Sequence, residues 1–291
     1  MKNLPRVAAV HDLSCFGRCS LTIVLPTLAA MGVQCCPLPT ACLSTHTGGF
    51  TGNTFLDLTE QMEAIAAHWK SLELRFDGIY TGFMGSRRQM ALTEDFLRAF
   101  RRPGCLAVVD PVMGDHGRPY RTYTPEMCRA MASLAELADV VTPNRTEAAL
   151  LLGVPYEELR LDTEADCRRW AEALSLEGRR SVVLTGVSVE PGAAGAVCFD
   201  RAAGRTELVL APLAEGSYHG TGDLFAGVLT GGLVKGAALA EAAGRAAEFV
   251  SRCARRTREA GTPVREGVVF EDQLWRLGAP ARERPPEDAE E

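Results

Sequence analysis

The sequence has 291 residues, enough to bury a large core, and its 46% hydrophobic and 23% charged residues are typical of a soluble globular protein. The formal net charge of −6 disfavours nucleic acid as a partner, no apolar run is long enough to span a membrane, and the N-terminus lacks a secretory signal. We therefore expect a cytoplasmic protein without nucleic-acid or membrane partners, with its ten cysteines mostly reduced.

Short β-rich segments alternate with longer helical ones along the whole chain. This alternation predicts an α/β fold, a three-layer α/β/α sandwich with a mostly parallel central sheet and helices on both faces. The two prolines in 33–43 favour an edge or irregular strand, and 195–200 with 205–211 predicts a β-hairpin. In chain order we predict strand 5–10, helix 20–32, strand 33–43, helix 56–72, strand 76–83, helix 88–100, strand 105–112, helix 125–137, strand 139–143, helices 146–153 and 164–178, strands 181–187, 195–200 and 205–211, and two Ala-rich helices reaching about residue 260.

The domain organisation follows from composition. No linker rich in Gly, Ser or Pro divides the middle of the chain, so we expect a single domain over residues 1–278. The segment 279–291 has too little apolar surface to fold, and we expect it to be a disordered acidic tail.

Polar and Gly-rich segments follow most of the predicted strands. Because the carboxyl ends of parallel strands meet at one sheet edge, where ligands bind in such folds, we expect these segments to converge on one cleft. They are HDLS (11–14), STHTGG (44–49), TGFMG (81–85), DPVMGD (110–115), TPNRTE (142–147), LTGV (184–187) and GTGD (220–223).

Two of these segments stand at predicted helix starts and have two interpretations each. In GTGD, the free N–H groups of a first helical turn form an anion site, whereas Asp223 by itself also fits a simple helix cap. In TPNRTE, Asn144 and Glu147 are three residues apart, which fits either a capping box or a pair of groups facing one magnesium ion.

Taken together, in this order and spacing, the segments resemble the ribokinase-like superfamily of small-molecule kinases, and within it the pyridoxal (vitamin B6) kinase branch. The resemblance covers about residues 5–255. It implies an ATP-dependent kinase that phosphorylates the 5'-hydroxymethyl group of a B6 vitamer. It also implies that Asp223 is the catalytic base and that the N–H groups of Gly220, Thr221 and Gly222 bind the transferring phosphate.

The resemblance assigns further residues to three kinds of ligand. It implies that Mg²⁺ lies near Asp110 and Glu147, and it leaves open whether a monovalent cation such as K⁺ assists. It also implies a homodimer. For the nucleotide it implies Asp115, Asn144, Thr185, Gly220, Thr221 and Gly222, and for the vitamer Asp12, His46, Thr47, Phe83 and Val112.

Two features depart from the pattern or leave it open. Asp12 stands where B6 kinases usually have a Ser that hydrogen-bonds the ring, so the preferred vitamer stays open; an acid there suits a protonated ring nitrogen or the amine of pyridoxamine. The segment 116–126 is rich in Gly, Pro, Arg and Tyr, which is consistent with a lid over the nucleotide.

Three other functions compete with this one. Hydroxymethylpyrimidine kinase of thiamine synthesis has the same fold and a similar flat substrate, and a non-catalytic vitamer-binding protein would also keep the fold. A sugar kinase is less favoured, because such enzymes carry extra lid strands, whereas here 33–50 leads directly to a predicted helix.

Overall fold

The computed structural model describes residues 4–278, so the predicted acidic tail lies outside the described part of the chain. Within this part of the chain, nine strands form one sheet and two very short strands form a separate hairpin. The strands of the large sheet are β1 (Arg6–Ser14), β2 (Gln34–Leu43), β3 (Phe55–Asp57), β4 (Gly78–Thr81), β5 (Leu106–Val109), β8 (Val140–Val141), β9 (Ser181–Val187), β10 (Ala193–Asp200) and β11 (Arg205–Pro212). Those of the hairpin are β6 (Gly114–Asp115) and β7 (Arg118–Pro119).

The order of the large sheet is β11-β10-β9-β8-β5-β4-β1-β2-β3. The strands from β9 to β2 are all parallel, whereas β10, β11 and β3 add antiparallel pairs at the two edges. The predicted hairpin is present as β10 and β11, paired from Ala193↔Pro212 to Asp200↔Arg205. The parallel centre brings the carboxyl ends of β1, β4, β5, β8 and β9 to the same edge.

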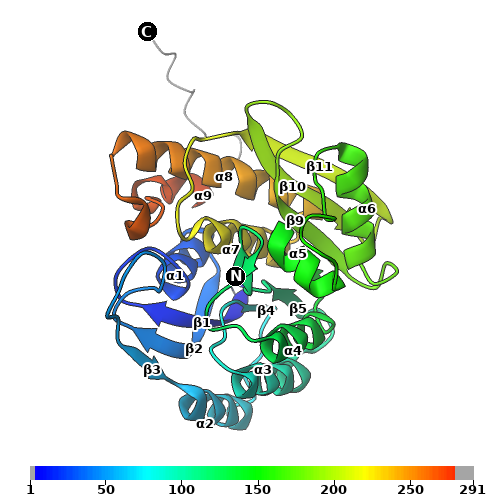
Figure 1. The fold of residues 1–291 in the computed structure, drawn as a ribbon. Coiled ribbons are helices and arrows are strands. Elements are labelled where there is room, and N and C mark those ends of the chain that lie inside the picture. Colours follow the sequence, from blue (N-terminus) through cyan, green and yellow to red (C-terminus); the bar gives the residue numbers. More distant parts are fainter. Residues whose placement is uncertain (1–3, 279–291) are drawn as a thin grey trace.

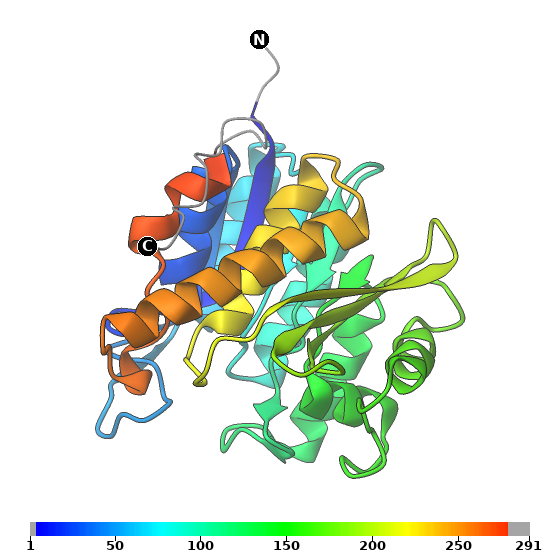
Figure 2. The same ribbon diagram turned by 90° about the horizontal axis from the view of Figure 1, so that it is seen from above.

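Helices cover both faces of the sheet, so the predicted three-layer sandwich is confirmed (Figures 1 and 2). Helices α2 to α6 cover one face, and α1, α7, α8 and α9 cover the other. Within residues 4–278, none of the helices is long and apolar enough to cross a bilayer. The helices are α1 (Leu21–Ala30), α2 (Thr59–Ser71), α3 (Arg87–Phe100), α4 (Pro125–Ala135), α5 (Arg145–Leu152), α6 (Glu164–Leu174), α7 (Thr221–Val234), α8 (Leu239–Glu259) and α9 (Trp275–Gly278), with short 3-10 turns η1 (Val264–Glu266) and η2 (Glu271–Gln273).

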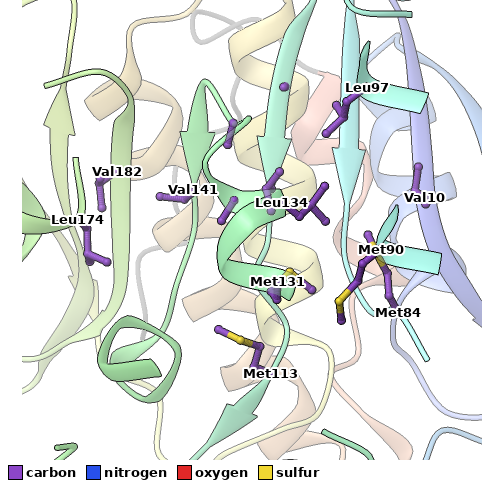
Figure 3. Packing of buried hydrophobic residues seen from close by; sticks show 14 of the residues in the cluster. Val10, Met84, Met90, Leu97, Met113, Met131, Leu134, Val141, Leu174 and Val182 are labelled. Atoms are coloured by element: carbon purple, nitrogen blue, oxygen red, sulfur yellow. The ribbon is translucent and has the colours of Figure 1, made fainter. Parts of the chain in front are cut away.

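The two hydrophobic clusters sit on opposite faces of the sheet. In β1, Ala8 and Val10 point into the cluster under α2 to α6, while Val7 and Ala9 point into the cluster under α1, α7 and α8. All four are fully buried, as expected for a strand covered on both faces. Figure 3 shows the first cluster, in which methionines such as Met131 fill the space between helices and sheet.

Three local predictions were wrong or incomplete. Strand β1 continues to Ser14 because it stays paired with β2 through a bulge between His11 and Leu13, so Asp12 lies in a strand and not in a loop. The segment Phe55–Asp57 is a strand on the edge of the sheet, not the start of a helix, so the chain does not run directly from residue 50 into a helix. The two 3-10 turns and α9 after residue 260 were not predicted.

The prediction for β2 is partly confirmed. The part of β2 that contains Pro37 and Pro39 pairs with β1 only, because β3 covers just Ala41–Leu43. A proline has no N–H to donate, so it is best tolerated where a strand has a partner on one side only, as this part of β2 does.

Asp139, which directly precedes β8, connects the sheet to two neighbouring segments. Its buried carboxylate accepts the Ala107 N–H at 2.9 Å and pairs with Arg101 at 2.6 Å and with Arg201 at 2.9 Å. We expect Asp139→Ala to lower the free energy of unfolding by about 2 to 4 kcal/mol, because it leaves a buried N–H without an acceptor and breaks both ion pairs.

Urea denaturation measures this effect, and Asp95→Asn is the matched control. Asp95 pairs with Arg98 on the exposed surface of α3, so its replacement should change the free energy of unfolding by less than about 0.5 kcal/mol. Equal effects of the two substitutions would contradict the structural role of Asp139.

Candidate active site

The predicted site residues gather at the carboxyl edge of the parallel strands. Asp12 lies near the end of β1, Asp110 directly follows β5, and Thr185 lies in β9. Asp223 lies in the first turn of α7, close enough to Asp110 for the negative charge of one to raise the pKa of the other. Segments far apart in the sequence thus place several acidic groups side by side, as the topology predicts.

The N-terminus of α7 is open to an anion. Gly220 stands at the N-cap position with a φ of 82°, and as a glycine it has no side chain to cap the amides of the first turn. A Cβ on Gly220 would lie 2.3 Å from the carbonyl oxygen of Arg18, whereas a Cβ on Gly222 would meet nothing within 4 Å. The two glycines therefore differ: Gly220 is required by the packing of the protein, and Gly222 leaves free space beside the amides.

Asp223 does not cap its own helix. Its Oδ2 accepts the backbone N–H of Ser20 at 2.8 Å, a donor that comes from the start of α1. The side chain is partly exposed, and removal of water from the carboxylate by the surrounding protein raises the pKa of Asp223 to about 7. A carboxylate with this proton affinity is suited to accept a proton at neutral pH.

Asp110 interacts with Asp223 on one side and with a third carboxylate, that of Glu147, on the other. Asp110 accepts the hydroxyl of Thr142 at 3.1 Å, and burial raises the pKa of Asp110 to about 8, with a further contribution from Asp223. Burial also raises the pKa of Glu147 well above its usual range, and the charge of Asp110 adds to this. Several negative charges placed this close together destabilise the folded protein unless a cation is bound beside them.

These carboxylates suit a hydrated magnesium ion. Between residues 4 and 278, no group of three or more His, Cys, Asp or Glu side chains is arranged to hold a metal. Mg²⁺ retains several waters and takes one or two carboxylates together with phosphate oxygens, so Asp110 and Glu147 fit its requirements.

Asn144 and Glu147 form the capping box that was one of the two predicted interpretations. Asn144 Oδ1 accepts the Glu147 N–H at 3.0 Å, and Glu147 Oε2 accepts the Asn144 N–H at 2.9 Å. Glu147 Oε1 also accepts the Met113 N–H at 3.1 Å, and Asn144 Nδ2 donates to Gly114 O at 3.0 Å. Each carboxylate oxygen has a second lone pair, so the capping box and a metal ligand are compatible.

The predicted substrate residues differ in whether their side-chain hydrogen-bond donors and acceptors are free to bind a ligand. His46 is buried, and its Nδ1 accepts the Gly48 N–H at 3.1 Å. Because the carbonyl of Arg265, 2.7 Å away, can only accept, His46 Nε2 must donate, which fixes the tautomer and leaves only the ring face for a ligand. Asp12 is also buried, and both of its oxygens accept serine hydroxyls.

Other predicted residues of the site keep exposed surface. Thr47 and Asp115 are exposed, and Val112 and Thr185 are half-buried, with the Thr185 hydroxyl donating to Pro143 O at 3.3 Å. Phe83 is half-buried and packs against the core, which includes Tyr123 with its ring centroid at 6.2 Å.

The segment predicted as a lid, residues 116–126, begins in the turn of a small hairpin formed by β6 and β7. Gly117 in its turn donates its N–H to Thr146 Oγ1 at 2.9 Å, and the ring of Tyr156 lies against Gly117 so closely that a Cβ there would be 2.9 Å away. Asp115 is the last residue of β6, next to the turn of this hairpin, and the start of α5 holds the hairpin beside the Asn144–Glu147 capping box.

The segment around η1 was missed as part of the site. The Arg265 carbonyl accepts from His46, the Glu266 carbonyl accepts the Arg18 N–H at 3.0 Å, and the Val268 N–H donates to His219 O at 3.0 Å. These contacts tie together loops that carry the predicted substrate and phosphate residues. Pro263 and Gly267 mark a turn, but turn residues alone do not indicate what the turn contacts.

The raised pKa of Asp110 leads to a prediction about stability. A buried acid whose pKa is raised by folding binds a proton that the unfolded chain releases, so the ligand-free protein loses stability as pH rises from about 4 to about 8. We expect Asp110→Asn to raise the free energy of unfolding by about 1 to 3 kcal/mol at pH 8, with a smaller gain at pH 5.

Urea denaturation at the two pH values tests this expectation, again with Asp95→Asn as the control at an exposed position. A gain that is equal at pH 5 and pH 8 would show that the Asp110 carboxylate is not destabilised in the folded protein.

Comparison with known proteins gives the family. The phosphomethylpyrimidine kinase family matches residues 24–267. A protein of Bacteroides thetaiotaomicron assigned as a phosphomethylpyrimidine kinase, with a structure in a form with pyridoxal, is 43% identical, with a TM-score of 0.89 over 96% of this chain and 97% of that chain. The pyridoxal kinase of Lactobacillus plantarum is 33% identical, with a TM-score of 0.86 over 94% and 97% of the two chains.

A relative from the thiamine side is also similar. The hydroxymethylpyrimidine/phosphomethylpyrimidine kinase of Rhizobium meliloti is 31% identical over 232 residues, which are 78% of this chain and 81% of that protein. The chain therefore belongs to the phosphomethylpyrimidine kinase family and, within the ribokinase-like superfamily, to the pyridoxal kinase branch.

Proposed function

We propose that the protein is a pyridoxal kinase, which transfers the γ-phosphoryl group of ATP to the 5'-hydroxymethyl group of pyridoxal, pyridoxamine or pyridoxine in the salvage of pyridoxal 5'-phosphate. One observation carries this proposal. The Asp223 carboxylate is held by the Ser20 N–H beside a helix N-terminus that has no side-chain cap, so a proton acceptor and an anion site lie next to each other.

The reaction assigns each group a step. The vitamer hydroxyl oxygen attacks the γ-phosphorus, the bond from that phosphorus to the leaving ADP oxygen breaks, and the hydroxyl proton passes to Asp223. The N–H groups of Gly220, Thr221 and Gly222 stabilise the charge on the transferring group. The free space beside Gly222 admits the phosphate to these amides.

The remaining polar residues serve the nucleotide. Mg²⁺, held by Asp110 and Glu147 largely through water, would neutralise phosphate charge. We assign Thr185, Asn144 and Asp115 to the nucleotide side, where Asn144 acts by holding the β6–β7 hairpin through Gly114 O. A monovalent cation such as K⁺ is a further candidate for the same concentration of negative charge.

The vitamer lies at the other end of the site in this proposal. The relative with a structure in a form with pyridoxal is 43% identical over nearly the full length, which supports a pyridine ligand. We place the ring between His46, Thr47, Phe83 and Val112, where it would meet the face of the imidazole. We also propose a cytoplasmic homodimer, for which the sedimentation of the pure protein is the direct test.

A second candidate function is the phosphorylation of hydroxymethylpyrimidine. The match to the phosphomethylpyrimidine kinase family and the relative from Rhizobium meliloti favour it. A non-catalytic vitamer-binding protein is less favoured, because such a protein has no need for Asp223 beside open helix amides.

Steady-state kinetics with separate substrates distinguishes the two kinases. We expect kcat/KM for at least one of pyridoxal, pyridoxamine and pyridoxine to exceed that for hydroxymethylpyrimidine by about tenfold or more, a difference of about 1.4 kcal/mol in transition-state binding. The opposite order would replace the pyridoxal kinase assignment by hydroxymethylpyrimidine kinase.

Replacement of the base tests the chemistry for either substrate. We expect Asp223→Asn to lower kcat by about 100- to 10,000-fold, while the Kd for ATP, measured by calorimetry, changes little. In the unmodified enzyme, kcat/KM should fall as pH drops below about 7, because protonated Asp223 cannot accept the hydroxyl proton.

Asp95→Asn on α3 is the matched control, since it makes the same chemical change at an exposed position and should leave kcat unchanged. Retention of normal turnover in Asp223→Asn would remove Asp223 as the base.

A further inference from the structure

We propose that Asp12 and Ser20 are positioning residues for Asp223, and that Asp12 acts through Ser20 and not by binding the vitamer. The inference rests on the proposed function, because it assigns Asp223 as the base. The resemblance implied that Asp12 contacts the vitamer, and this proposal assigns it a different role. The new role also explains why an acid replaces the serine that B6 kinases usually have there.

The carboxylate of Asp12 accepts hydrogen bonds from two serine hydroxyls. Ser20 Oγ donates to Asp12 Oδ1 at 2.6 Å, and Ser14 Oγ donates to Asp12 Oδ2 at 2.9 Å. The side chain is only 4% exposed. A ligand contact would therefore require Asp12 to give up one of two hydrogen bonds in a place with little access to solvent.

Ser20 has a backbone conformation that needs support. Its φ of 49° and ψ of −131° lie outside the regions that residues other than glycine usually occupy. Two anchors hold it there: its hydroxyl is bound to Asp12, and its carbonyl accepts the Val24 N–H at 2.9 Å as α1 begins.

This conformation directs the Ser20 N–H at the base. The N–H donates to Asp223 Oδ2 at 2.8 Å, so one carboxylate oxygen is fixed by the protein and Oδ1 is left to take the substrate proton. Asp12, Ser20 and Asp223 thus form a hydrogen-bonded chain from β1 through the start of α1 to the start of α7. A serine at position 12 has a shorter side chain, so its single oxygen does not extend as far toward the Ser20 hydroxyl as Asp12 Oδ1 does.

The kinetic test separates positioning from substrate binding. We expect Asp12→Ala to lower kcat by about 10- to 100-fold with KM for the vitamer within about threefold, because a misdirected base slows the chemical step without weakening binding. Asp12→Asn keeps one oxygen that can accept the Ser20 hydroxyl, and it should recover most of the lost turnover. Ser20→Ala should resemble Asp12→Ala, and the double variant should be little worse than either single one.

Ser71→Ala is the matched control for Ser20→Ala. It makes the same chemical change at the exposed end of α2, where Ser71 Oγ donates to His68 O at 2.8 Å. We expect kcat within about twofold of the unmodified enzyme.

A second measurement needs no turnover and works even where the kinase assignment fails. The amide proton of Ser20, observed by NMR in the full chain, should lie downfield because it donates to a carboxylate, and Asp223→Asn should move it upfield. Asp12→Ala and Ser20→Ala should also move the amide proton of residue 20 upfield, whereas Ser71→Ala should leave it in place. Should Asp12→Ala not fold, Ser20→Ala gives the same readout.

Two results would overturn the proposal. A KM for the vitamer raised tenfold or more in Asp12→Ala, with kcat retained, would make Asp12 a substrate-binding residue. An unchanged Ser20 amide shift together with an unchanged kcat in Asp12→Ala would show that Asp12 does not position the base. Absence of kinase activity in the unmodified protein, with the expected NMR shifts present, would reject the proposed function and keep the structural chain.

Discussion

The site depends on the close approach of two backbones, at Gly220 and at Arg18. Only a residue without a Cβ fits at 220, because a Cβ there would be 2.3 Å from the Arg18 carbonyl oxygen. This approach brings the first turn of α7 against the loop that follows β1, and it allows the Ser20 N–H to reach Asp223. The same loop is held from the other side by the Glu266 carbonyl, so the position of Asp223 is set by segments from both ends of the chain.

The acidic groups at this edge of the sheet lower the stability of the folded protein, and they also supply the charge and proton acceptors that a reaction can use. Asp110 and Glu147 are both buried; the charge of Asp110 makes the ionised form of Glu147 less favourable, and the charge of Asp223 does the same to Asp110. A protein selected for stability alone would place neutral or apolar groups there. Retaining them is understandable when a cation and a nucleotide occupy the site during turnover, since binding to the folded state stabilises it.

The fold was largely predictable because its signals are local. Alternating strand and helix patterns, and caps such as Ser86 and Thr124, depend on neighbouring residues. The errors came from long-range contacts: the pairing that extends β1 through Asp12, and the edge strand Phe55–Asp57, are determined by strand β2. For the site, the sequence indicated which residues lie together. It did not indicate that both Asp12 oxygens accept serine hydroxyls, or that the η1 segment contacts the site.

At the substrate end of the site, a residue that the family pattern assigns to the ligand can have no hydrogen-bonding group left to bind it. His46 stands where B6 kinases contact the pyridine ring, yet both of its ring nitrogens are bonded to the backbone. Its ring lies among Phe50 and His219, with centroids at 5.1 Å and 4.7 Å. A flat heteroaromatic ligand meeting such a group gains contact area from the ring face, which pyridine and pyrimidine rings offer equally. Polar groups that keep free lone pairs or protons must then distinguish the two kinds of ring. Among the predicted substrate residues, the exposed Thr47 meets this requirement, whereas His46 and Asp12 do not.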